Sequence, residues 1–443
     1  MYRWPPSLPP TPCFVLSGAT VPSCLVSDPP ADAPVDGEGR VRVDIEVADG
    51  SIRTLASAGG TPADAQVPRI ECDGNQVWPC FVDVHTHLDK GHIWPRSENP
   101  DGTFAGALAA SASDRDARWT EADIAARMSF ALEAAYAHGT VAIRTHLDSV
   151  PPLHDVAWSV FARLRDEWRG RIALQAATIV ALDRLMGSYG DELADLVASH
   201  GGVLGGMPVP GSELDRQLDR VFGLAAARGL DLDFHADESG DVNARALEAI
   251  ALAKQRHGFD GRVVVGHCCS LAMQPADMVE RTLDVVAAAG IVIVSLPMSN
   301  LYLQDRVPAR TPRWRGVTLL HEMHSRGIPI VLASDNCRDP FFGYGDHDML
   351  EVFTQATRIA HLDRPVEPWP TAITCTPASV MGLAAAGCLR VGAPADLVLF
   401  NARGYSELLS RPQSDRLVLR AGRGIDTMPP CYRELDAVVA APT

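Results

Sequence analysis

The sequence predicts an α/β protein: a (β/α)8 barrel with a small β-sandwich domain built from both ends of the chain. Three observations lead to this fold class. Apolar, strand-like runs alternate with helical stretches from about residue 79 onward, and short β-branched segments occur near both termini. The 443 residues exceed what one ordinary core needs, and the 47% hydrophobic content is that of a globular protein.

Eight apolar runs supply the expected barrel strands. They are residues 79–87, 140–148, 171–180, 201–209, 230–238, 262–269, 290–298 and 328–336. Most are nearly continuous in apolar residues, as expected of strands covered by helices on both faces. Alanine- and leucine-rich stretches between them, such as 121–139 and 213–229, end in glycines at 139 and 229, which is typical of a helix C-terminus. The alternation predicts a (β/α)8 barrel over residues 79–385.

The two ends of the chain have a different character. Residues 1–12 are rich in proline and predict a flexible arm. Residues 13–78 and 386–443 contain short segments of alternating β-branched residues separated by turn residues. We therefore expect these two stretches to form one small β domain, with the barrel inserted between them.

Charge and cysteine content restrict the partners and the compartment. The formal net charge of −16 repels nucleic acids and anionic membranes, so we expect a small-molecule substrate and neither of those partners. The ten cysteines form no regular framework, and the N-terminal segment lacks the charge order of a signal peptide. We expect reduced thiols, a cytoplasmic protein and, because barrels of this kind often assemble, a homo-oligomer.

The carboxyl ends of barrel strands carry the chemistry of such proteins. In FVDVHTHLDK, His85 and His87 share one strand face about 7 Å apart, where they could bind a metal or merely cap the strand. Polar residues also end the strands that follow: His146, Asp148, His235, Glu238, His267 and Asp335. Such side chains are costly to bury unless they are paired or bound, and imidazole with carboxylate suits a catalytic divalent ion. This ring of residues favours a metal site.

The strand positions also separate the candidate metal ligands from the candidate proton-transfer residues. His235 and Asp335 come from strands across the barrel and can complete the metal site begun by the first-strand histidines. Glu238 follows His235 by three residues, in a loop over the barrel mouth, where a carboxylate can reach both a metal-activated water and a substrate. Glu238 and His267 are therefore the candidate general acid–base residues. We interpret the polar pair ending the second strand as support for the ligands.

The ordered motifs HTH, HADE, GHCC and SDN resemble those of the amidohydrolase superfamily, and in particular the bacterial cytosine deaminase branch. The resemblance covers nearly the whole chain, including ASDNCRDPFFGYGDHDML. It implies one metal ion per chain, Zn2+ or Fe2+, because the bridging lysine of two-metal members is not found. The implied metal ligands are His85, His87, His235 and Asp335.

The same resemblance implies three catalytic residues. Glu238 would protonate a ring nitrogen of the substrate, and His267 would orient the attacking hydroxide. Asp335 would accept the proton of the metal-activated water. The implied reaction is hydroxide attack on an amino-bearing ring carbon, with loss of ammonia.

The resemblance also implies substrate contacts, and here the sequence departs from it. Gln175 would bind the amide edge of the substrate, which its donor and acceptor suit, although a purely structural amide is the alternative. Asn336 replaces a second aspartate, Lys90 replaces a threonine and Phe341 replaces a tryptophan. Because of these replacements, the sequence does not decide which heterocyclic ring is bound.

We expect an amino-substituted N-heterocycle as substrate, with a cytosine-like pyrimidine first. An N-alkylamino-triazine, which would lose an alkylamine, and a pterin are the alternatives. A cyclic amidase would call for the bridging lysine. A non-catalytic barrel would be expected to lack a metal ligand, whereas the ligand set is complete.

Overall fold

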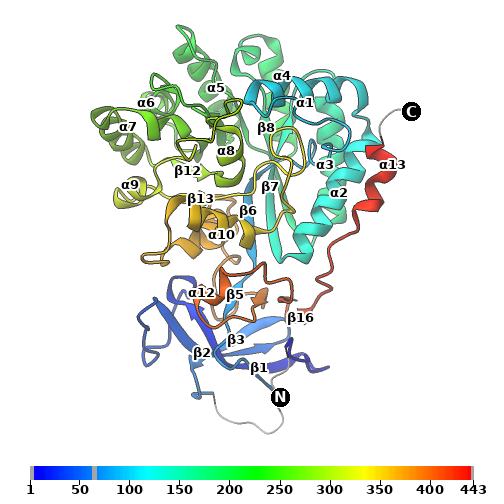
Figure 1. Cartoon of the computed structure of the whole chain (residues 1–443), viewed down its shortest axis with the longest axis vertical. Helices are drawn as coiled ribbons and strands as arrows, with labels where there is room; N and C mark the ends of the chain where they lie inside the picture. Colours follow the sequence, from blue (N-terminus) through cyan, green and yellow to red (C-terminus); the bar gives the residue numbers. More distant parts are fainter. Residues whose placement is uncertain (1–3, 62–66, 441–443) are drawn as a thin grey trace. The chain divides into compact units, whose positions relative to one another are not determined.

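The computed structural model describes residues 4–61 and 67–440, which group into two compact units (Figure 1). Residues 1–3 of the expected arm lie outside the described residues, and the first strand begins at Cys13. One unit comprises the chain up to Asp83, Glu133–Ala142 and Asp348–Pro430. The other comprises Val84–Leu132, Ile143–His347 and the segment from Cys431. Within the described residues, no helix combines the length and apolarity needed to cross a bilayer.

The first unit contains two four-stranded sheets among its described residues. One sheet has the order β3-β2-β1-β4, with β1 Cys13–Pro22, β2 Arg40–Ala48, β3 Ser51–Ser57 and β4 Arg69–Glu71. The other has the order β16-β15-β14-β5, with β5 Val77–Pro79, β14 Leu397–Leu399, β15 Leu417–Arg420 and β16 Arg423–Gly424. Because β5 pairs with β14, strands from both ends of the chain build the second sheet.

Helices and one disulfide complete this unit. The helices are α10 Met349–Ala360, α11 Cys375–Val380 and α12 Tyr405–Leu408. Cys375 and Cys388 are joined by a disulfide, contrary to the expectation of reduced thiols throughout. The two cysteines are 13 residues apart in the sequence and belong to no regular cysteine pattern, so the sequence did not predict their pairing. The fold brings their Cα atoms to 5.5 Å.

The barrel strands lie inside the eight apolar runs that the sequence indicates. They are β6 Phe81–Thr86, β7 Thr140–Asp148, β8 Ala173–Ile179, β9 Leu204–Gly206, β10 Leu232–Ala236, β11 Val263–His267, β12 Val292–Ser295 and β13 Ile330–Leu332. They form the sheets β6-β7-β8 and β13-β12-β11-β10-β9. Parallel bridges between Ala177 and Val203, and between Thr86 and Asp335, join the two sheets at both edges. The strands therefore close into a parallel (β/α)8 barrel.

Helices follow the strands, as the alternating pattern predicts (Figure 1). They are α1 Phe104–Arg118, α2 Glu121–Ala137, α3 His154–Glu167, α4 Ser188–Ser199, α5 Leu214–Arg228, α6 Ala246–His257, α7 Ala276–Ala289, α8 Pro297–Leu303 and α9 Leu320–Ser325. Gly229 ends α5 with a φ of 64°, a left-handed conformation that glycine adopts without strain.

The C-terminal segment belongs with the barrel unit. Residues 431–440, which we expected in the small β domain, group with the barrel unit instead and include α13 Asp436–Val439. The carbonyl oxygen of Val438 accepts a hydrogen bond from Arg96 of the barrel unit at 2.6 Å. A polar backbone contact of this kind leaves no hydrophobic pattern, so the sequence could not indicate it.

Candidate metal centre and substrate pocket

Three buried imidazoles and one carboxylate converge at the barrel mouth. The Nε2 atoms of His87 and His235 lie 3.4 Å apart. Oδ1 of Asp335 lies 3.2 Å from Nε2 of His87 and 3.6 Å from Nε2 of His85. Two of these residues come from the end of β6, one from β10, and Asp335 follows β13 by three residues. The structure therefore brings together all four predicted ligands.

These residues fit a divalent metal ion. Four donors placed about 2.0–2.1 Å from a tetrahedral ion would be about 3.4 Å apart, close to the distances between these atoms. Burial, reinforced by His146, lowers the pKa of His85 and of His235 well below the usual value. The imidazoles are therefore neutral and can offer a nitrogen lone pair to the ion.

A polar network lies beside this centre. The ring of His146 is 4.0 Å from that of His85, measured between centroids, and its Nε2 lies 3.2 Å from Oδ1 of Asp233. Arg144 donates to the other oxygen of Asp233 at 2.8 Å. His146 therefore lies between His85 and the Asp233–Arg144 pair, and its support of the ligands stays a prediction.

Gln175 does not lie where a residue that binds the substrate would have to be. It occupies the middle of β8, four residues before the strand ends, and its Oε1 accepts a hydrogen bond from Arg144 at 2.9 Å. Ile179 and Val180, at the end of the strand, line the pocket, and Gln175 does not. The alternative of a structural amide fits this position, and we assign Gln175 no contact with substrate.

Glu238 and His267 lie together beside the metal centre. Oε1 of Glu238 accepts a hydrogen bond from Asn300 at 3.1 Å and lies 3.3 Å from Nδ1 of His267. Burial, followed by the nearby Asp335 carboxylate, raises the pKa of Glu238 well above its usual value. Burial lowers the pKa of His267 to about 4. The raised pKa of Glu238 favours the protonated carboxyl, which can donate its proton, while His267 is neutral near pH 7.

Two further polar residues of this centre lie on α8, directly after β12. Asn300 contacts both Glu238 and His267, with its Nδ2 at 3.1 Å from Nδ1 of the histidine. The hydroxyl of Ser299 donates to Oδ2 of Asp335. Both residues lie a few positions beyond the end of β12, so strand-end positions alone do not indicate them. The available signal is a polar Ser-Asn pair within an apolar turn that begins at Pro297.

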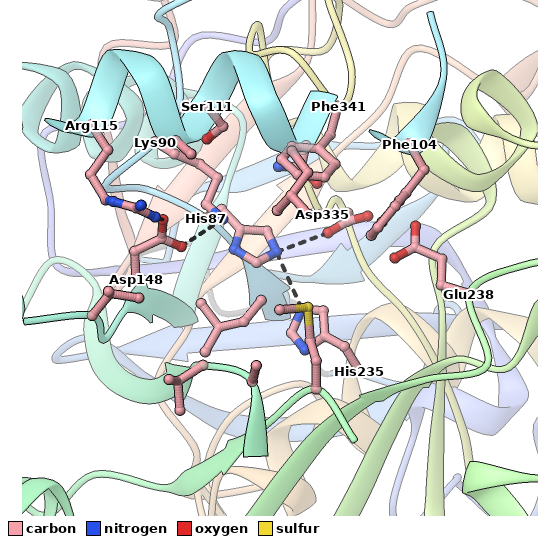
Figure 2. Close-up of a pocket in the computed structure, with 18 of the residues that line it drawn as sticks. His87, Lys90, Phe104, Ser111, Arg115, Asp148, His235, Glu238, Asp335 and Phe341 are labelled. Carbon is pink, nitrogen blue, oxygen red and sulfur yellow. Dashed lines mark hydrogen bonds and ion pairs between the residues drawn. The ribbon is translucent and has the colours of Figure 1, made fainter. Parts of the chain in front are cut away.

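A cavity of about 270 Å³ opens beside the metal centre, and Figure 2 shows its lining residues. The cavity is lined by the remaining predicted substrate contacts, which are Lys90, Asn336 and Phe341. Nζ of Lys90 lies 2.8 Å from Oδ1 of Asp148 and 5.4 Å from the centroid of the Phe341 ring. Although burial disfavours the ammonium, Asp148 and Asp89 raise the pKa of Lys90, which therefore stays charged.

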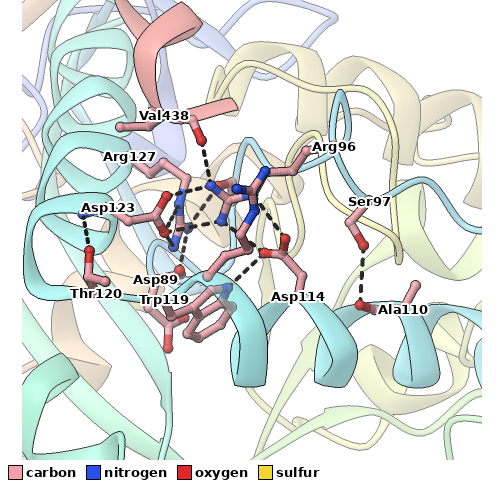
Figure 3. Close-up of polar contacts among 12 residues, drawn as sticks. Asp89, Arg96, Ser97, Ala110, Asp114, Trp119, Thr120, Asp123, Arg127 and Val438 are labelled. Carbon is pink, nitrogen blue, oxygen red and sulfur yellow. Dashed lines mark hydrogen bonds and ion pairs between the residues drawn. The ribbon is translucent and has the colours of Figure 1, made fainter. Parts of the chain in front are cut away.

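One wall of the cavity is formed by α1. Its contributions are Phe104, Leu108, Ser111, Ala112 and Arg115. Arg96 contacts the flank of α1: its side chain is 2% exposed and donates to both oxygens of Asp114 at 3.0 and 2.9 Å (Figure 3). Arg96 also donates to Asp123 of α2 at 3.1 Å. The guanidinium therefore couples this wall to α2 and to the C-terminal segment.

Comparison with known proteins identifies the family. A model of the "Amidohydrolase family" matches residues 180–425, more than half of the chain. The chain belongs to the amidohydrolase family. This amidohydrolase is 52% identical over 429 residues to the pterin deaminase of Rhizobium rhizogenes, with 97% of each chain covered. It is 26% identical over 369 residues to the N-isopropylammelide isopropyl amidohydrolase of a Pseudomonas species, covering 80% of this chain and 86% of the relative.

Solved structures share the fold of this amidohydrolase. The 5-methylcytosine deaminase of Klebsiella pneumoniae, liganded with 5-fluorocytosine, superposes with a TM-score of 0.78 at 23% identity, covering 93% of this chain and 97% of that one. The N-isopropylammelide isopropylaminohydrolase of Burkholderia multivorans gives a TM-score of 0.72 at 24% identity, with the same coverage. These structures support the fold, while the family assignment and the 52% identical relative identify the protein as a hydrolase.

Proposed function

We propose that this amidohydrolase is a metal-dependent deaminase of pterins. The observation that carries the proposal is the 52% identity to a pterin deaminase across 97% of both chains. The likeness to the 5-methylcytosine deaminase, at 23% identity, supports the fold alone. We therefore rank a pterin, an alternative in the sequence analysis, ahead of a cytosine-like pyrimidine.

The proposed reaction exchanges the 2-amino group of the pterin for oxygen. His85, His87, His235 and Asp335 would hold a divalent ion, Zn2+ or Fe2+, which would lower the pKa of a bound water. Glu238 donates its proton to a ring nitrogen beside the amino-bearing carbon, which makes that carbon electrophilic. Asp335 would accept a proton from that water, and His267 would orient the attacking oxygen. The carbon–nitrogen bond then breaks, so that one water and one pterin give one ammonia and one pteridine-2,4-dione.

The pocket offers suitable contacts for a flat ring system. Lys90 can donate to the ring carbonyl, and Asn336 has both a donor and an acceptor for a ring edge. The rings of Phe341 and Phe104, 5.6 Å apart between centroids, form an apolar wall for the faces of the substrate. The cavity continues along α1 to Arg115, which gives room for a second ring.

A substrate comparison tests the assignment. The metal-loaded enzyme is assayed with pterin, with cytosine and with an N-isopropylamino-triazine, by release of ammonia or isopropylamine. We expect kcat/KM for pterin to exceed that for cytosine by about 100-fold, because cytosine leaves the second-ring space unfilled. A kcat/KM for cytosine equal to or above that for pterin would contradict the pterin assignment but not hydrolytic deamination.

Substitution of Lys90 tests its role in binding the substrate. Lys90→Met is expected to lower kcat/KM for pterin by about 10- to 100-fold, since a hydrogen bond to a charged group contributes about 1.5–3 kcal/mol. Lys254→Met, in α6 and away from the pocket, is the matched control and should leave kcat/KM unchanged. Equal kinetics for Lys90→Met and the unmodified enzyme would remove Lys90 from the substrate site.

A further inference from the structure

We propose a second metal site, separate from the catalytic centre, in which His92, Cys337 and His347 bind one zinc ion. His92 lies in the loop between β6 and α1, whereas Cys337 and His347 lie between β13 and α10. The three side chains are 1%, 2% and 3% exposed. One donor atom from each residue lies within 4.8 Å of the other two.

The burial of His92 is the observation that most directly indicates a ligand. Neither of its ring nitrogens forms a hydrogen bond with any residue that the structure describes. The ring lies against Phe130 and His347, with centroid distances of 4.9 and 5.7 Å. A buried polar group without a partner is costly, and a bound ion would remove that cost. Two imidazoles and one thiolate are donors that suit zinc.

The backbone holds the donors in place from two separate segments. His92 and His347 have φ values of 64° and 55°, in the left-handed region that residues other than glycine seldom adopt. The backbone N–H of His92 donates to the carbonyl of Cys337 at 3.0 Å. The backbone N–H of His347 also donates a hydrogen bond to the Cys337 sulfur, so the two segments are linked at the thiol as well. The site is thus organised before an ion binds.

The location of the cluster points to a structural rather than a catalytic ion. None of the three residues lines the substrate pocket. Cys337 follows Asn336 directly, and His92 lies two positions after Lys90, so each segment also carries a pocket residue. An ion bound here joins the two segments, and its thiol proton is released to solvent when the ion binds.

Cobalt substitution tests this site without substrate, so the result is independent of the proposed deaminase activity. The protein is freed of metal with a chelator and reconstituted with excess cobalt(II). We expect two ions per chain and a sulfur-to-cobalt charge-transfer band in the near ultraviolet. The catalytic centre has no sulfur donor, so the band reports only the second site. One ion per folded chain and no such band would overturn the proposal.

Matched cysteine variants assign the band. Cys337→Ser should lose the band and one of the two ions. Cys80→Ser is the control, because Cys80 is equally buried and its thiol donates to the carbonyl of Leu419, a bond that serine can keep; it should retain both ions and the band. His92→Ala provides a second test in case Cys337→Ser does not fold, and it should also lose one ion. Retention of two ions by both site variants would contradict the assignment of ligands.

Discussion

Glu238→Gln is expected to lower kcat with pterin by about 10²- to 10⁴-fold while the catalytic ion stays bound. Glutamine has nearly the shape of glutamic acid and can still accept the hydrogen bond from Asn300. It has no carboxyl proton to transfer, whereas the raised pKa of Glu238 favours the protonated form. The loss should therefore appear in kcat more than in KM. Steady-state kinetics and metal analysis of the same preparation measure both quantities.

Glu248→Gln is the matched control for this substitution. Glu248 lies on α6, 3.8 Å from Arg245, and does not line the pocket. Its substitution should change neither turnover nor metal content. If Glu238→Gln kept a kcat within a few-fold of the unmodified enzyme, Glu238 would not be the proton donor.

His235→Ala is expected to have the largest effect on activity. It removes one of the four donors from the catalytic centre, so the catalytic ion should be lost and turnover should fall by about 10⁶-fold or more, toward the uncatalysed rate. The fold should survive, since Ala is compatible with the buried end of β10. Metal content, thermal melting and ammonia release are measured on one sample.

The exposed His257→Ala variant controls for the loss of an imidazole. His257 ends α6 and lies 2.8 Å from Asp219, far along the chain from any proposed ligand. It should retain the metal and full activity. A His235→Ala protein that kept both the catalytic ion and its turnover would contradict the ligand assignment.

The barrel and its ring of donors could be predicted because both follow from local pattern. Apolar runs of the right length identify strands, and parallel strands bring their carboxyl ends to one edge. His85 and His87 share a face through the two-residue period of a strand, and this period does not depend on tertiary structure. The convergence of these donors therefore could be inferred from residue type and position, whereas their binding of a metal ion stays a prediction.

The contacts of the substrate pocket could not be predicted in the same way. Gln175 has suitable chemistry, but β8 continues for four residues beyond it, and residue type alone does not bring a side chain to the strand end. Asn300 and Ser299 lie beyond their strand, on a short helix. The α1 wall depends on Arg96, whose partners come from separate parts of the chain. Such contacts are set by tertiary packing, which leaves no periodic signal in sequence.

Isotope labelling tests the central claim, hydrolytic deamination of a pterin, most directly. Metal-loaded enzyme is incubated with pterin in water enriched in oxygen-18, and ammonia and product are quantified together. We predict one ammonia for each pterin consumed and one oxygen-18 atom in the new carbonyl at ring position 2. Recovery of intact pterin without ammonia, or of a product without the label, would contradict the account.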